Sequence, residues 1–259
     1  MNFDWGFFWQ YLLWPSSVYL YGLWLTLSVS VISQGLGTVL GLFIALAKIS
    51  RYRLLSVPAS IFIWIFRGTP LLVQIVFIYT GLAAANIFRF EDINLGFATL
   101  PGNMQAGVLA LTLNEAAYMA EIIRAGIASV NMGQTEASKS LGMTYGLYMR
   151  RIILPQAARV VVPPLGNEFN AMLKNTTLLS VIGVPELLLA TQMVTSITFR
   201  VFELYLVVAC YYLTLTTLWG FVQQRLEARF GDPNSATSAS GGTKGFLRMF
   251  GFGRSGETR

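Results

Sequence analysis

The sequence predicts an all-α integral membrane protein with about five membrane-spanning helices. Of its 259 residues, 54% are hydrophobic and only 12% are charged, and the mean hydropathy is +0.58. A typical soluble domain carries about 25% charged residues, so the surface of this chain is unsuited to water. Long runs without a charged residue then show where the chain crosses the bilayer.

The first charge-free run, between Asp4 and Lys48, divides into two parts. Residues 1–17 are rich in Trp and Phe, which favour the headgroup region, so we expect an interfacial aromatic segment there. Pro15 interrupts this segment near its end. The stretch Tyr19–Ala47 is apolar for longer than the roughly 20 residues that cross a bilayer, and we expect it to be the first span.

Four further apolar stretches follow, each with few charged residues. We expect the spans to be Leu54–Leu82 with Arg67, Gln105–Ser129 with Glu115, Glu121 and Arg124, Val160–Val184 with Glu168 and Lys174, and Val201–Gln224 with Glu203. Together with the first span they make up a transmembrane domain of residues 18–230. Residues 231–259 begin with a Gly, Ser and Thr-rich linker, so we expect a disordered tail.

Lysine and arginine placement predicts the orientation. With the N-terminus outside and the C-terminus inside, most of the 18 basic residues lie on the cytoplasmic side, and only Arg89 and Arg200 fall in outer segments. This is the distribution expected from the positive-inside rule. It also accounts for the net charge of +6 without any contact with nucleic acid. The basic, aromatic end of the tail either moves freely or touches anionic lipid at the inner leaflet.

Several kinds of chemistry are excluded by composition. The chain has no histidine and a single cysteine, Cys210. Ser-His-Asp and Cys-His catalysis, zinc sites built on His or Cys, and intrachain disulfides are therefore ruled out. A GxxxxGK[ST] phosphate-binding loop is also absent, so we expect that the chain does not hydrolyse ATP. The sequence therefore does not describe an enzyme.

The longest inner connection, about residues 130–159, has a pattern of its own. Residues 136–141 can form a short helix, with Gly133 before it and Gly142 placed to end it. A short helix that is exposed to the cytoplasm and anchored by a span on each side suits docking into the groove of a partner protein.

This connection resembles the EAA loop of ATP-binding-cassette (ABC) importer permeases. Glu136-Ala137 is followed by Gly142, by Ile152 and by Leu154-Pro155, and Ser138 stands where the pattern has Ala. Other stretches resemble the polar amino acid branch of that family, namely GLWLTLSVSVISQGLGTVLGL, FRGTPLLVQ, LNEAAYMAEIIRAGI and GNEFNAMLKNTTLLSVIG. The resemblance covers roughly residues 18–230.

The resemblance implies a type I importer permease in a bacterial inner membrane. Two permease chains, identical or paralogous, would form the pathway, and two ATPase subunits carrying ATP and Mg would bind from the cytoplasm. An extracytoplasmic binding protein would deliver the amino acid, and this chain itself would bind no cofactor. The residues that would couple the pathway to the ATPases are Gln134, Glu136, Ala137, Ser138, Leu141, Gly142 and Met143.

Charged groups inside the predicted spans are candidates for the pathway, because each costs about 2.5–3.5 kcal/mol at a bilayer centre unless it is paired or hydrated. Glu168 and Asn175 are seven residues apart and share a helix face, and Thr176 adds a hydroxyl nearby. This face can bind a polar amino acid, and in relatives that import basic amino acids acidic or amide groups at these two positions contact the cargo. Alternatively, Glu168 forms an ion pair with Lys174 or with another helix.

Glu115 and its neighbour Asn114, two further candidates for the pathway, lie near the middle of the third span. Glu115 would either face the same cavity or neutralise Arg67. Pro70 lacks an N–H and so frees the carbonyl of Phe66, which loosens the second span there. Arg67 beside this loosened backbone would either bind the substrate carboxylate or pack around a kink.

Two acidic groups against one arginine favour a cationic cargo, so we expect an importer of polar, possibly basic, amino acids. The alternative that the residues leave open is an ion-coupled secondary amino acid transporter, which also uses intramembrane acids. Such a transporter would not need the EAA loop, and no internal repeat of the kind common in that class is visible.

Overall fold

The computed structural model describes residues 3–94, 96 and 99–230 and is almost entirely helical. The predicted disorder of residues 231–259 lies outside the described residues. The helices are α1 (Trp5–Leu13), α2 (Ser17–Ile49), α3 (Arg53–Gly68), α4 (Leu71–Val76), α5 (Leu82–Ala84), α6 (Gly102–Ala128), α7 (Met132–Ser140), α8 (Tyr145–Tyr148), α9 (Leu154–Asn175), α10 (Leu187–Thr198) and α11 (Val201–Phe230). The π-helical segments η1 (Phe77–Gly81) and η2 (Met149–Ile153) and the 3-10 helix η3 (Thr176–Ile182) connect some of them, and two short strands, β1 (Ile93–Asn94) and β2 (Thr99–Leu100), pair antiparallel.

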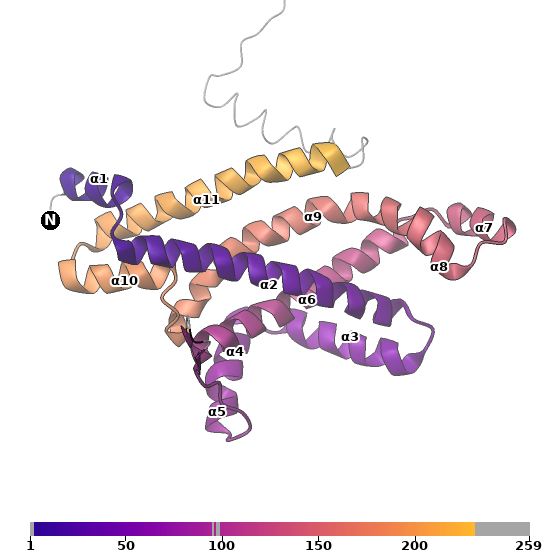
Figure 1. The fold of residues 1–259 in the computed structure, drawn as a ribbon, viewed down its shortest axis with the longest axis horizontal. Helices are drawn as coiled ribbons and strands as arrows, with labels where there is room; N and C mark the ends of the chain where they lie inside the picture. Colours follow the sequence, from indigo (N-terminus) through magenta and orange to yellow (C-terminus); the bar gives the residue numbers. More distant parts are fainter. Residues whose placement is uncertain (1–2, 95, 97–98, 231–259) are drawn as a thin grey trace, which may run out of the picture.

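The described residues contain three helices long and apolar enough to cross a membrane, α2, α6 and α11. Two bent helix pairs bring the number of candidate spans to five if each pair counts as one. Figure 1 shows α2, α9 and α11 running lengthwise, with α7 and α8 at one end of the molecule and α1 and α10 at the other. We call these the α7 end and the α1 end. The sequence predicts that the α7 end is cytoplasmic.

The core of the bundle is the contact between α2 and α6, which run parallel. Gly37 lies against Glu115, and one turn further on Gly41 lies against Met119. Small residues at this spacing let two membrane helices approach closely. Ala116, Ala117 and Ala120 on α6 are likewise fully buried.

The predicted N-terminal aromatic segment contains α1, which is fastened to the start of α11. The backbone N–H of Asp4 donates to Glu203 Oε1 at 3.1 Å, and Arg200 bridges the carboxylates of Asp4 (3.2 Å) and Glu203 (3.4 Å). The hydroxyl of Tyr211 donates to the carbonyl of Leu12 at 3.0 Å. These contacts hold the two chain segments together at the α1 end.

The predicted span Leu54–Leu82 is broken near Pro70, where the sequence indicated a loosened helix. The helix stops at Gly68, and the chain continues into α4, η1 and α5 after a bend of 108°. Thr69 is extended at the break (φ −118°, ψ 146°), as expected for a residue that precedes a proline.

The predicted span Val160–Val184 covers only part of a longer, bent helical segment. Helical structure runs from Tyr145 through α8, η2, α9 and η3 to Ile182 and is followed, after a 51° bend, by the unpredicted helix α10. Gly183 makes the break with a φ of +79°, a conformation that glycine adopts without steric cost. The Glu186 carboxylate then caps α10 by accepting from the N–H groups of Leu188 (2.9 Å) and Leu189 (2.8 Å).

Candidate coupling helix and polar membrane cluster

The predicted cytoplasmic helix is present as α7, and its two ends are well defined. The Asn131 side chain accepts from the N–H of Gly133 at 2.8 Å and caps the first turn. At the other end, the N–H of Gly142 donates to Lys139 O (2.9 Å) and that of Met143 donates to Ser138 O (3.1 Å). This pair of bonds is the Schellman motif, which needs a left-handed residue after the helix. Gly142 supplies it with a φ of +71°.

Most of the seven predicted coupling residues face outward. Gln134, Glu136, Ala137, Leu141 and Gly142 are exposed, and Met143 is half-buried. Leu141 is a large apolar side chain that is 80% exposed at the molecular surface, directly after the end of α7.

Ser138 differs from the other six, because it is buried. Its hydroxyl donates to the carbonyl of Gln134 at 2.5 Å, and α7 packs against η2. A serine therefore fits the position where the resembled pattern has alanine, since the hydroxyl is satisfied within its own helix.

The side-chain amides of Gln74 and Asn114 form hydrogen bonds across the break between α3 and α4. The carbonyl of Phe66 accepts from Gln74 Nε2 at 2.8 Å and from Asn114 Nδ2 at 3.1 Å. Asn114 Nδ2 also lies 3.0 Å from Gln74 Oε1, and Gln74 Nε2 reaches Thr69 O and Thr69 Oγ1. The backbone groups left without partners at the break are thus satisfied inside the protein, as a membrane environment requires.

The amide of Gln74 is the part of this network that the sequence reasoning missed. The pattern around Pro70 pointed to a free carbonyl on Phe66 but gave no donor for it. A glutamine one turn into the helix that follows a proline break is a signal that could have found one, because its side chain reaches back to the break.

Replacing Gln74 with leucine should therefore lower the free energy of unfolding by about 1–3 kcal/mol, because buried carbonyls lose their donors. The measurement is thermal unfolding of the purified protein in detergent. Leucine at Gln192, which is exposed on α10, is the matched control and should leave the midpoint nearly unchanged. Equal effects of the two variants would contradict the role given to Gln74.

Glu115 and Arg67, predicted pathway residues, have different partners in the structure. Glu115 is 4% exposed, and its Oε1 accepts from Gln34 Nε2 at 2.7 Å. Arg67 is exposed, with its Cζ 5.2 Å from the centroid of the Tyr118 ring. Within the described part of the chain, no ion pair joins Glu115 to Arg67. Gln34 is a further residue that the sequence reasoning did not single out.

Glu168 and Asn175 are both half-buried on α9. Glu168 lies within electrostatic range of Arg67, which attracts it, and of Glu115, which repels it. Lys174 is exposed and forms no ion pair with Glu168 among residues 3–230 that the structure describes. Thr176 is completely buried, and its hydroxyl donates to Leu173 O at 2.8 Å. Glu168 therefore lies near both Glu115 and Arg67 in the structure, whereas Thr176 is turned into the core.

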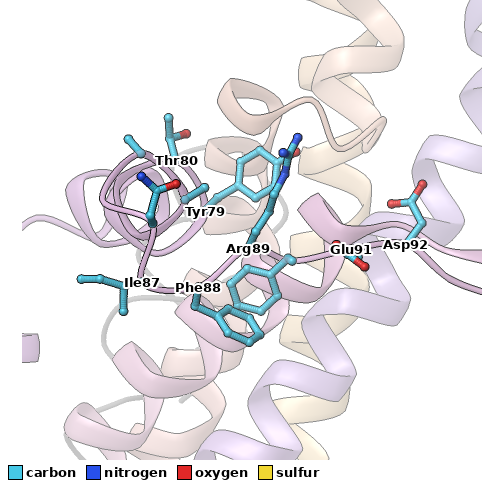
Figure 2. Close-up of a pocket in the computed structure, with 11 residues that line it drawn as sticks. Tyr79, Thr80, Ile87, Phe88, Arg89, Glu91 and Asp92 are labelled. Atoms are coloured by element: carbon cyan, nitrogen blue, oxygen red, sulfur yellow. The ribbon is translucent and has the colours of Figure 1, made fainter.

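A separate hollow of about 1130 Å³ is lined by the end of η1, by α5 and by the chain that follows α5. Figure 2 shows Tyr79, Phe88 and Arg89 around this hollow and Asp92 farther along the chain. The carboxylate of Asp92 accepts from the N–H of Gly102 at 2.8 Å and so caps the start of α6. Arg89 remains exposed.

Comparison with known proteins decides the family. Residues 37–232 match the family described as "Binding-protein-dependent transport system inner membrane component". The chain belongs to this family. It is a permease subunit of an ABC importer in the bacterial inner membrane, a transport component and not an enzyme.

Among its relatives, the arginine transport system permease protein ArgU of Corynebacterium glutamicum is 42% identical over 82% of this chain and 68% of that one. The glutamine transport system permease protein GlnP of Escherichia coli K12 is 36% identical over 88% of this chain and 98% of that one. A crystal structure of an amino acid ABC transporter with histidines has a TM-score of 0.77 at 39% identity, covering 88% of this permease and 100% of that chain.

These findings confirm the predicted fold class and family. A structure of the MetNI methionine ABC transporter, at 20% identity and a TM-score of 0.67, shares the type I permease fold. The family implies that the permease works with ATPase subunits and a binding protein. It also favours an ABC importer over the ion-coupled secondary transporter that the residues alone left open.

Proposed function

We propose that this permease carries basic amino acids and is coupled to ATP hydrolysis through the exposed face of α7. The observation that carries the coupling is a short, doubly capped helix whose apolar end, Leu141, and acidic residue, Glu136, both face outward. A rigid helix of this kind can seat in a groove of an ATPase subunit. Its motion can pass to η2, against which α7 packs, and from η2 to α9.

The assembly that we propose contains two permease chains, identical or paralogous, and two ATPase subunits that hold ATP and Mg at the α7 end. The binding protein docks at the opposite side of the membrane. The permease itself binds no cofactor and no nucleic acid.

The cargo assignment rests on Glu168. This carboxylate is half-buried on α9, and Glu115, a second carboxylate, lies within electrostatic range of it. Arg67, which lies within electrostatic range of Glu168, is exposed and stacked on Tyr118. Two neighbouring carboxyl groups favour a guanidinium or ammonium group of the cargo, and Arg67 can bind its carboxylate. The similarity to an arginine permease agrees with a basic cargo.

The test is ATP hydrolysis by the complete transporter in proteoliposomes, with binding protein loaded in turn with arginine, lysine, glutamine or glutamate. We expect arginine or lysine to stimulate hydrolysis most. Stimulation chiefly by a neutral or acidic amino acid would overturn the cargo class while leaving the coupling untouched.

Replacing Glu168 with glutamine should weaken arginine-driven transport about tenfold and glutamine-driven transport much less, because an ion pair to the cargo is reduced to a neutral hydrogen bond. Uptake of each radiolabelled amino acid measures the effect. Asparagine in place of Glu91, an exposed residue of the predicted outer loop, is the charge-matched control. An equal loss of both cargoes would assign Glu168 to helix packing.

A further inference from the structure

A mostly apolar hollow lies at the α7 end, between the last turns of α2, the start of α3, and α8 with η2. Its volume is about 900 Å³, within the range of about 300–1,000 Å³ that is usual for ligand sites. Its apolar walls are formed by Phe43, Leu46, Leu55, Tyr145 and Met149. Three of these side chains, Phe43 (63%), Leu55 (50%) and Tyr145 (63%), are substantially exposed, so the hollow opens to the surroundings of the bundle.

Arg51 brings a positive charge to this hollow. Its Nη2 donates to the hydroxyl of Tyr52 at 2.9 Å, and its Cζ lies 5.0 Å from the centroid of the Tyr52 ring. No carboxylate pairs with Arg51 among the residues that the structure describes. By contrast, the nearby Lys48 and Arg124 both pair with Glu121.

The length of α2 allows the hollow to lie at the level of the lipid headgroups. A helix of 33 residues is about 50 Å long, whereas the hydrocarbon core of a bilayer is about 30 Å thick. With the bilayer centred on α2, Phe43 and Leu46 near the end of the helix lie between the hydrocarbon and the headgroup region. Tyr52 and Tyr145 are of the residue type that gathers at this boundary.

We propose that this hollow binds one anionic phospholipid. The lipid packs an acyl chain against the apolar wall that includes Leu46 and Leu55, and its phosphate accepts hydrogen bonds from the guanidinium of Arg51. Arginine suits this role because its fork of N–H groups can bind two phosphate oxygens at once, and basic pockets between helices bind anionic headgroups. An apolar wall next to Arg51, which has no carboxylate partner among the described residues, favours a lipid over a protein partner.

The experiment titrates the purified full-length protein in mild detergent with phosphatidylglycerol or with phosphatidylcholine of the same acyl chains, and follows bound lipid by native mass spectrometry. We expect preferential retention of one phosphatidylglycerol molecule. Arg51→Gln should weaken this binding about tenfold, because a charged hydrogen bond to phosphate is lost. Arg53→Gln is the matched control, since Arg53 is exposed two residues away but is not part of the hollow, and it should change binding less than twofold.

A second variant tests the apolar wall without changing the charge. Ala47 lines the hollow, and Ala47→Trp should fill it and reduce the binding of both lipids. Equal binding of the two lipids by the unmodified protein, or equal effects of the Arg51 and Arg53 variants, would overturn the proposal. So would loss of the co-purified ATPase subunit from Arg51→Gln with lipid binding intact, because that result would assign the hollow to the protein partner.

Discussion

Replacing Gly142 with valine should lower both amino acid transport and transport-linked ATP hydrolysis about tenfold, while the membrane bundle remains folded. A β-branched residue at a φ of +71° costs about 1–3 kcal/mol, which corresponds to roughly 5- to 150-fold in a conformational equilibrium. The last turn of α7 would lose the Schellman bonds from Gly142 and Met143, so the helix would no longer present Leu141 in one fixed position.

The strain at Gly142 arises from the backbone alone, because a Cβ added there meets no atom within 4 Å. Two further variants use this fact. Gly146→Val places the same side chain in equally open space, within α8 and without a positive φ, and should retain most of the activity. Gly142→Asn should also retain more activity than valine, since asparagine tolerates the left-handed conformation.

Transport and ATP hydrolysis are measured in proteoliposomes, and binding of the ATPase subunit is measured by co-purification. The coupling role of α7 would be contradicted if valine and asparagine at position 142 gave the same activity. A loss of folded protein with Gly142→Val alone would instead place Gly142 among the residues needed for folding.

The three spans formed by α2, α6 and α11 and the position of α7 could be predicted from the sequence, because they depend on local signals. Charge-free runs such as the one between Asp4 and Lys48 directly indicate which segments cross the bilayer. Gly142 marks the end of α7 because few other residues accept its conformation. Neither prediction depends on which segments of the chain are in contact in the folded protein.

The two bends could not be predicted from hydropathy, because an apolar run looks the same whether or not the helix continues. Pro70 gave the position of the first bend but not the angle of 108°, which depends on how α4 packs against α6. The helix α10 has only 12 residues, too few to register as a span.

The partners of the intramembrane polar groups were also beyond sequence reasoning. Glu115 was a candidate counter-ion for Arg67, yet it is bonded to Gln34, which lies 81 positions away in the sequence. Asn114 was placed in the pathway, and in the structure it donates to Phe66 O. Contacts of this kind follow from the close approach of helices, which the pattern of single residues does not reveal.

Because α2 and α6 approach so closely, we expect a large loss of stability when Gly37 is replaced. Replacing Gly37 with alanine should lower the thermal unfolding midpoint by about 3–10 °C, because overpacking a core costs about 1–3 kcal/mol. The added Cβ would lie 2.6 Å from both Cβ and Cγ of Glu115, so α2 and α6 must move apart. Gly35→Ala is the matched control, since no atom lies within 4 Å of its added Cβ.

Gly41 distinguishes a clash between helices from a purely local effect. Its added Cβ would lie 2.7 Å from Met119 Cβ and 2.9 Å from the carbonyl oxygen of Ala116, so Gly41→Ala should destabilise the protein on its own. Once one alanine has forced α2 away from α6, the second clash is already partly relieved. The double variant should therefore lose less stability than the sum of the two single variants. Strict additivity in detergent unfolding would show that each alanine is accommodated locally and that the two helices do not move as one unit.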